Sequence, residues 1–255
     1  PTWRDVPPLM SLKSMARDQL GTVGAGNHYV DIMAEVPEDW RLGDPIADGA
    51  PVWVAVHFGS RGFGHRTASG FLNLAAGRPF DAGAPGESMD QPPTLIPVGS
   101  ELGQAYIAAM RLAGRYAYAG RDYVVDQVLR ILGARATFTV HNHHNFAWYE
   151  EHRGVKGWVI RKGATPLFPG QLGFIGGSMG DVAVVVEGVD HEESQAALYS
   201  TVHGAGRVMS RTQAAGKWRR QGGRRVRAGG AVDMDAVRRR LAGAGVAVCG
   251  ADADE

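Results

Sequence analysis

Short apolar runs separated by glycine-rich turns dominate the pattern of hydrophobic and polar positions along this chain. Residues 52–56 form an apolar run and residues 136–140 a β-branched and aromatic one, both typical of strands. Residues 29–32 alternate between polar and apolar side chains and also predict a strand. Further strands are predicted at residues 158–160, 172–175, 181–186 and 246–248.

One long segment instead has the spacing of a helix. Apolar residues recur every three or four positions from residue 101 to about residue 132, which predicts one buried helical face. Ser100 is placed to cap this helix, and Gly120 is the position where a break is expected. A shorter helix is predicted at residues 235–241. Residues 76–99 predict a long ordered loop because they are rich in proline and glycine.

Composition narrows the class of protein. The 255 residues suffice for one large or two small domains, and 44% apolar with 21% charged residues is typical of a soluble globular protein. A lone cysteine, Cys249, excludes an internal disulfide framework and fits a reducing compartment, so we expect a cytoplasmic protein. No apolar run approaches the ~18 residues of a membrane span.

Charge is uneven along the chain. The net charge is only +1, yet eleven Lys or Arg and two acidic residues lie between Arg207 and Arg240. Such a run would hold a polyanion if it folded onto one face, and a solvated helix surface is the alternative interpretation.

The stretch with the clearest chemistry is His203 followed by the small residues Gly204–Gly206. These residues let a ligand approach the backbone closely, and their N–H groups would hold an anion if a helix began after Gly206. Arg207 and Arg211 would then share a helical face and grip phosphate. A histidine so placed can attack phosphorus and carry a nucleotidyl group. A plain glycine turn before a basic helix is the alternative.

Several other histidines are candidate metal ligands. His28 precedes the strand at residues 29–32, and His57 ends the strand at residues 52–56. Three histidines in four residues, at 141, 143 and 144, are the strongest local metal signal. On a strand the first two would share a face and His144 would point the other way. Ordinary structural or surface histidines are the alternative.

Basic residues also follow predicted strands. Arg61 lies in a Gly/Ser/Arg turn after His57, and Arg161 and Lys162 follow residues 158–160. A glycine-rich turn at residues 176–180 contains Ser178. These groups suit phosphate or nucleotide contacts, and each can equally be part of an ordinary hairpin.

Taken in order, five stretches resemble the RtcB-type RNA-splicing ligases: residues 21–28, 57–62, 143–145, 161–164 with 177–180, and 203–207. The resemblance implies an α+β fold, with mixed central β-structure flanked by helices. It implies one catalytic domain over residues 1–255. Because the chain starts at Pro1 and stops at Glu255, we expect that domain to be incomplete at both termini.

The same resemblance implies an activity and a set of roles. The activity is GTP- and manganese-dependent joining of RNA 2′,3′-cyclic phosphate or 3′-phosphate ends to 5′-hydroxyl ends, and an archease-like activator would be a partner. His203 matches the guanylylated histidine. The metal ligands, for two Mn²⁺ ions, match His28, His57 and His144. The GTP/GMP pocket matches Asn27, Asp31, Ser178, Gly204, Ala205 and Gly206. The proposed contacts to RNA phosphate are Arg61, Arg161, Lys162 and Arg207.

The chain also departs from the family. Asp31 and Ala183 replace a glutamate and a serine of the guanylate pocket, and an upstream aspartate and bridging cysteine are missing. Cys249 is in the wrong place to substitute, and a C-terminal lysine is also missing. We therefore expect weak metal binding and impaired ligation without the missing parts. A metal-dependent phosphoesterase or nucleotidyltransferase, and a non-catalytic RNA-binding derivative, are the alternative functions.

Overall fold

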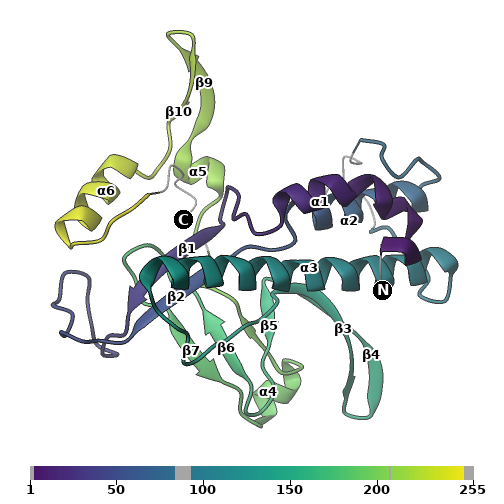
Figure 1. Cartoon of the computed structure of the whole chain (residues 1–255), viewed down its shortest axis with the longest axis horizontal. Coiled ribbons are helices and arrows are strands. Elements are labelled where there is room, and N and C mark those ends of the chain that lie inside the picture. Colours follow the sequence, from purple (N-terminus) through teal and green to yellow (C-terminus); the bar gives the residue numbers. More distant parts are fainter. Residues whose placement is uncertain (1–2, 84–92, 207, 250–255) are drawn as a thin grey trace. The chain divides into compact units, whose positions relative to one another are not determined.

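The computed structural model describes residues 3–83, 93–206 and 208–249. The chain divides into two compact units, one made of residues 1–24 and 56–135 and the other of residues 25–55 and 136–255. The first unit is helical, and the second carries most of the strands (Figure 1). The expectation of a single catalytic domain over residues 1–255 stays a prediction.

The first unit is built on α3 (Glu101–Leu132), which confirms the predicted long helix. The Ser100 side chain accepts a hydrogen bond from the Gly103 N–H, and Gly133 ends the helix at a φ of 63°. The helix does not break at Gly120. This glycine is buried, and a Cβ there would lie 3.3 Å from the Phe58 ring, so its small size serves close packing.

Against α3 lie α2 (Arg61–Ala75) and, beside α2, α1 (Lys13–Gln19), as Figure 1 shows. Two short 3₁₀ helices, η1 (Trp3–Asp5) and η2 (Pro7–Leu12), precede them. Phe63 and Phe71 are at most 1% exposed, and burying each contributes about 1.5–3 kcal/mol. The buried core of this unit comprises Val6, Leu9, Leu12, Ala16, Phe63, Phe71, Ala109 and Ala113.

The second unit combines short strands with short helices. Within the described residues, its strands form five two-stranded sheets instead of one large central sheet. The pairs are β1 (Tyr29–Ala34) with β2 (Val52–His57), β3 (Asn145–His152) with β4 (Val155–Lys162), β5 (Ala164–Pro166) with β8 (Ser200–Val202), β6 (Leu172–Ile175) with β7 (Val184–Glu187), and β9 (Lys217–Gln221) with β10 (Arg224–Ala228). The predicted α+β class is confirmed.

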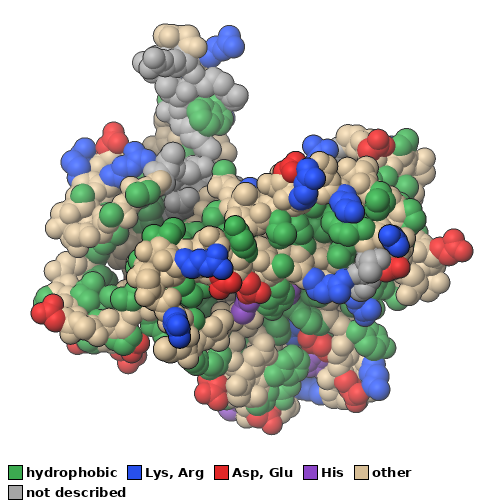
Figure 2. Space-filling view, in the orientation of Figure 1, with side chains coloured by type: hydrophobic (Ala, Val, Ile, Leu, Met, Phe, Trp, Pro, Cys, Tyr) green, Lys and Arg blue, Asp and Glu red, His purple; other side chains and the backbone are tan. Residues whose placement is uncertain are grey.

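Three helices complete the unit: α4 (Glu192–Ala196), α5 (Arg211–Ala215) and α6 (Met234–Gly243). The last confirms the helix predicted at residues 235–241. On the face drawn in Figure 2, Lys and Arg side chains gather over α6, which carries Arg238, Arg239 and Arg240. Leu241 of α6 is fully buried and anchors the helix. No helix in the described parts of the chain combines the length and apolarity that a membrane span needs.

Two predicted strands are wrong. Residues 136–140 form no strand: the segment is exposed and pairs with no other described strand, and its Phe138 ring contacts the Trp53 ring edge to face, with centroids 5.7 Å apart. Residues 246–248 form none either, because the Val246 N–H donates to the Leu241 carbonyl and turns the chain back onto the end of α6. The strand predicted at residues 181–186 begins only at Val184.

Candidate active site

His203 directly follows β8, and its ring is held in one orientation by the backbone. The antiparallel pairing of β8 with β5 places Val202 opposite Ala164, so His203 lies beside Gly163. The Nδ1 of His203 is 2.8 Å from the Gly163 carbonyl oxygen. A carbonyl only accepts, so Nδ1 carries the proton and donates it, and the ring lone pair resides on Nε2. This is the tautomer that a nucleophilic Nε2 requires.

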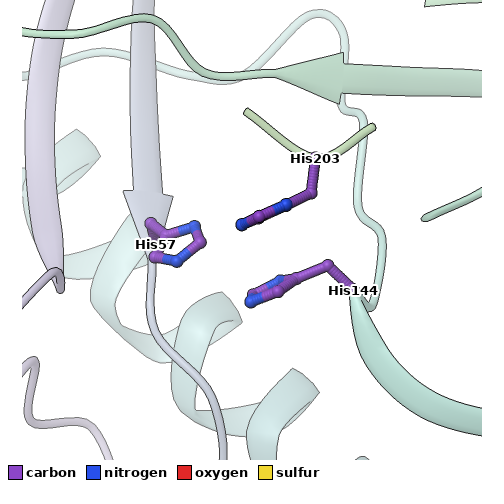
Figure 3. A group of neighbouring side chains, drawn as sticks. All are labelled: His57, His144 and His203. Atoms are coloured by element: carbon purple, nitrogen blue, oxygen red, sulfur yellow. The ribbon is translucent and has the colours of Figure 1, made fainter. Parts of the chain in front are cut away.

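Gly163 also fixes His144. The Gly163 N–H lies 2.7 Å from the His144 carbonyl oxygen and 3.0 Å from the Asn145 side-chain oxygen. Gly163 adopts a φ of 71°, a conformation that glycine enters without strain. The backbone of Gly163 therefore contacts both histidines, His203 through its carbonyl and His144 through its N–H. Their rings stack with centroids 4.6 Å apart and planes 11° from parallel (Figure 3).

A third histidine, His57, ends β2, the strand that pairs with β1. The boundary between the two compact units falls inside this strand, after Ala55. His57, His144 and His203 are each half-buried and each offer one ring nitrogen, and these nitrogens lie within 4.8 Å of one another (Figure 3). Such a group has the spacing and the ligand chemistry of a metal centre.

The other predicted histidines lie elsewhere. His28, half-buried before β1, is not part of this group among the described residues. His141 and His143 lie in an irregular segment rather than on a strand, and the ring of His143 stacks on Phe146 at 5.0 Å. Of the three clustered histidines, His144 is therefore the one brought to His203.

The turn after His203 is tied to the loop after β6. The Ala205 N–H donates to the Gly176 carbonyl at 2.9 Å, and Gly176 and Gly204 form an isolated β-bridge. The next helix, α5, begins only at Arg211 and is capped by Ser210. The prediction that a helix starts after Gly206 is therefore wrong. Arg207 lies outside the described residues.

Tyr29, a neighbour of the predicted guanylate-pocket residues in sequence, contacts the loop that is bridged to this turn. Tyr29 of β1 lies against Gly176, since a Cβ on that glycine would come within 2.7 Å of the Tyr29 hydroxyl. Asp31 lies on β1 two residues after Tyr29, and Asn27 precedes the strand; their predicted contact with the guanylate stays a prediction. Burial, and then the charge of Asp31, raise the pKa of Tyr29 to about 12, so its phenol stays protonated. Ser178 is exposed on the loop after Gly176.

Arg61 begins α2 with a φ of 56°, the left-handed region that a non-glycine residue rarely adopts. Its Nε donates to the Thr22 hydroxyl at 3.4 Å, and its guanidinium covers Gly24, where a Cβ would clash with it. A residue of α3, Arg121, hydrogen-bonds to the turn before Arg61. The buried Arg121 donates from a guanidinium nitrogen to the Phe58 carbonyl at 2.9 Å.

Arg161 and Lys162 differ sharply in their surroundings. Arg161 is 3% exposed, and its guanidinium forms a bidentate pair with Glu150 at 2.8 and 3.0 Å. It also donates to the Ser200 hydroxyl and the Leu198 carbonyl, both at 2.8 Å. Lys162 is exposed. The contacts of Arg161 are thus internal to the unit, and its predicted contact with RNA phosphate stays a prediction.

Two residues that position the site were missed by sequence reasoning. Gly163 was counted only as part of a motif, although a glycine directly after a predicted strand is a signal for a turn with positive φ. Glu150 gave no signal, because its partner Arg161 becomes its neighbour only through the pairing of β3 with β4.

Known proteins resemble this chain over most of its length. The family model described as tRNA-splicing ligase RtcB matches residues 7–240. The RNA-splicing ligase RtcB of Escherichia coli K12 is 34% identical over 206 residues, which cover 76% of this chain and 46% of that protein. The Mycobacterium tuberculosis RNA-splicing ligase RtcB is 36% identical over 231 residues, covering 77% and 50%.

The tRNA-splicing ligase RtcB of Pyrococcus furiosus is 33% identical over 239 residues, covering 81% of this chain and 24% of that protein. The chain spans about half the length of the Escherichia coli and Mycobacterium relatives. The family model covers most of this sequence, including the segments that carry His57, His144 and His203. The chain therefore belongs to the RtcB family.

Proposed function

We propose that this chain carries the nucleotidyl-transfer centre of an RNA ligase. The ligase would join RNA 2′,3′-cyclic phosphate or 3′-phosphate ends to 5′-hydroxyl ends, with GTP as the second substrate. Membership of the RtcB family supports the reaction class. The observation that carries the assignment to His203 is the Nδ1 hydrogen bond to the Gly163 carbonyl, which directs the lone pair to Nε2.

In the proposed reaction, Nε2 of His203 attacks the α-phosphorus of GTP, a P–N bond forms, and pyrophosphate leaves. An oxygen of the RNA 3′-phosphate then attacks the same phosphorus and breaks the P–N bond, which transfers the guanylate to RNA. The 5′-hydroxyl finally attacks the activated 3′-phosphate and GMP leaves. A 2′,3′-cyclic phosphate first adds water to give the 3′-phosphate. Throughout, the Gly163 carbonyl stabilises the positive charge that the His203 ring carries while it holds the guanylate.

The donor set fits a divalent ion such as Mn²⁺, although imidazole alone does not select manganese. One Nε2 lone pair cannot ligate an ion and attack phosphorus at the same time. We therefore assign His57 and His144 to the metal and His203 to the nucleophile, with His28 reserved for a second ion. When bound, the metal would neutralise negative charge on the reacting phosphates.

The remaining predicted residues complete the proposal. Asn27, Asp31 and Ser178 would contact the guanylate, with the shorter Asp31 giving weaker recognition of the guanine edge. Arg61 and Lys162 would contact RNA phosphate, and Arg61 holds its strained backbone through contacts with Thr22 and Gly24. An archease-like protein would act as an activator, and faster adduct formation in its presence would support that part.

The test is to incubate the protein with Mn²⁺ and GTP labelled at the α-phosphate, and to look for an acid-labile covalent adduct. His203→Ala should abolish the adduct, and His65→Ala, an exposed histidine of α2, should leave it unchanged. His144→Ala should weaken Mn²⁺ uptake, measured by equilibrium dialysis, while His203→Ala should retain it.

Two results would contradict the proposal. An adduct that persists in His203→Ala would place the nucleophile elsewhere. Release of phosphate from RNA ends with no adduct in any protein would favour the phosphoesterase alternative.

A further inference from the structure

Arg121 is a buried charge in the middle of α3. The residue is 7% exposed, and its guanidinium carbon lies 4.9 Å from the centroid of the Tyr118 ring, one turn earlier on the same helix. Arginine is seldom buried to this degree, because desolvating its charge is costly unless its N–H groups find acceptors. One of these groups donates to the Phe58 carbonyl at 2.9 Å. A buried charge is thus placed where α3 meets the chain that leaves β2.

Phe58 is held by α3 in two ways. Its backbone carbonyl accepts the hydrogen bond from Arg121, and its side chain is 2% exposed. The Phe58 ring packs on Gly120, where a Cβ would lie 3.3 Å from the ring. The two contacts come from consecutive residues of one continuous helix. The backbone and the ring of Phe58 are therefore both fixed relative to α3, which leaves this residue little freedom to rotate.

Phe58 is bonded directly to His57, the last residue of β2. The direction of the His57 ring follows its own backbone, which lies between the strand on one side and Phe58 on the other. The chain then turns into α2 at Arg61, where φ is 56°. A non-glycine residue stays in this left-handed region only when its surroundings hold it there. The contacts of α3 with Phe58 therefore fix the start of a turn that the backbone would not keep unaided.

We propose that Arg121 is a positioning residue for His57. Through the Phe58 carbonyl it sets the orientation of the His57 ring and so places that ring to bind the divalent ion. The inference rests on the proposed function for the role of His57 as a metal ligand. Arg121 acts through the backbone and not by contact with the ion. Without its hydrogen bond the turn relaxes, and the His57 ring samples several orientations, of which only some can bind metal.

The first measurement needs no metal. The ring signals of the nine histidines are recorded by NMR on protein that carries isotope-labelled histidine, and the His57 signals are identified by their loss in His57→Ala. Arg121→Met removes the donors and the charge but keeps much of the apolar stem, whereas Arg121→Lys keeps a charge and a donor. The matched control is Arg130→Met, which replaces an exposed arginine of the same helix.

In metal-free Arg121→Met the His57 ring signals should move or broaden, while those of the exposed His65 on α2 stay in place. Arg121→Lys should bring the His57 signals back toward their positions in the parent protein, because a lysine ammonium can donate to the same carbonyl. Arg130→Met should leave the signals of both histidines unchanged.

The second measurement is the dissociation constant for Mn²⁺, obtained by equilibrium dialysis. It should rise about tenfold in Arg121→Met, the lower end of the range for groups that orient a metal ligand from outside the coordination sphere. Arg121→Lys should restore most of the affinity, and Arg130→Met should keep all of it.

Phe71→Leu separates positioning from stability. Phe71 belongs to the buried core of the same unit, and its ring contacts the rings of Phe80 and Tyr106. The smaller side chain should lower the melting temperature of the unit because it leaves a cavity in that core. The His57 ring signals and the affinity for Mn²⁺, both measured well below the melting temperature, should stay at their parent values.

Unchanged His57 signals in Arg121→Met would overturn the inference, as would an equal displacement of those signals in Phe71→Leu. Displaced signals with an unchanged affinity for Mn²⁺ would overturn its metal-binding part. The two proposals fail in different ways. An intact His203 adduct with His57 signals indifferent to Arg121 would refute only this inference. No adduct in any protein, with His57 signals and Mn²⁺ affinity that do depend on Arg121, would refute only the nucleotidyl-transfer function.

Discussion

Replacing Arg161 with methionine should destabilise the second unit instead of weakening a contact with RNA. The Arg161 side chain is 2% exposed and that of Glu150 is 10% exposed, so their ion pair is shielded from water. The guanidinium also lies over the Trp148 ring at 5.0 Å. Methionine keeps much of the apolar stem but leaves the Glu150 carboxylate without its main partner.

The magnitude follows from that unpaired charge. Removing one member of a buried pair costs about 3–5 kcal/mol in the free energy of unfolding. At about 2–4 °C per kcal/mol for a unit of this size, the melting temperature should fall by roughly 6–20 °C. Adding Glu150→Leu should recover most of this loss, because two apolar side chains of similar volume leave no charge buried.

The assay is urea unfolding followed by far-ultraviolet circular dichroism, with Lys162→Met as the matched control on the same strand. Lys162 is exposed, so its replacement should change stability by less than about 0.5 kcal/mol. The reasoning is refuted if Arg161→Met unfolds like the parent protein and instead lowers RNA affinity with a flatter salt dependence. Arg161 would then contact phosphate as the sequence predicted.

Three further predictions concern stability. Ser100→Ala should lower the free energy of unfolding by about 1 kcal/mol in urea titrations, because the cap of α3 is lost, and no change would contradict the capping role. Gly180→Ala should lower the melting temperature, because φ is 74° and the new Cβ would meet Leu241 at 2.4 Å; an unchanged value would contradict this. Burial would raise the pKa of Glu150, but hydrogen bonds from Arg161 and His152 outweigh it and hold the pKa below its ordinary 4.5. The pair thus stabilises the fold above that pH and the stabilisation is lost as pH falls through the folded value, so acid unfolding curves of Glu150→Gln should lack this component.

The sequence by itself determined the elements whose signals are local. The helix of residues 101–132 follows from its apolar spacing and from the hydroxyl of Ser100, which acts on the first turn alone. The strands ending at His57 and Lys162 follow from apolar runs bounded by turn residues. The motif histidines could be named for the same reason, since each motif is contained in a few consecutive residues.

Tertiary structure decided which of these residues meet. Residues 136–140 have the side chains of a strand, but a strand needs a partner for its backbone, and Phe138 instead packs on Trp53. His144 lies next to His203, whereas His141 and His143 do not, because the Gly163 N–H bonds to the His144 carbonyl. The pairing of β5 with β8 in turn places Gly163 beside His203, although the paired residues are nearly forty positions apart in sequence. The different surroundings of Arg161 and Lys162 depend on which side of β4 faces Glu150. Local sequence cannot encode these outcomes, because each is fixed by contacts between segments that meet only in the folded chain.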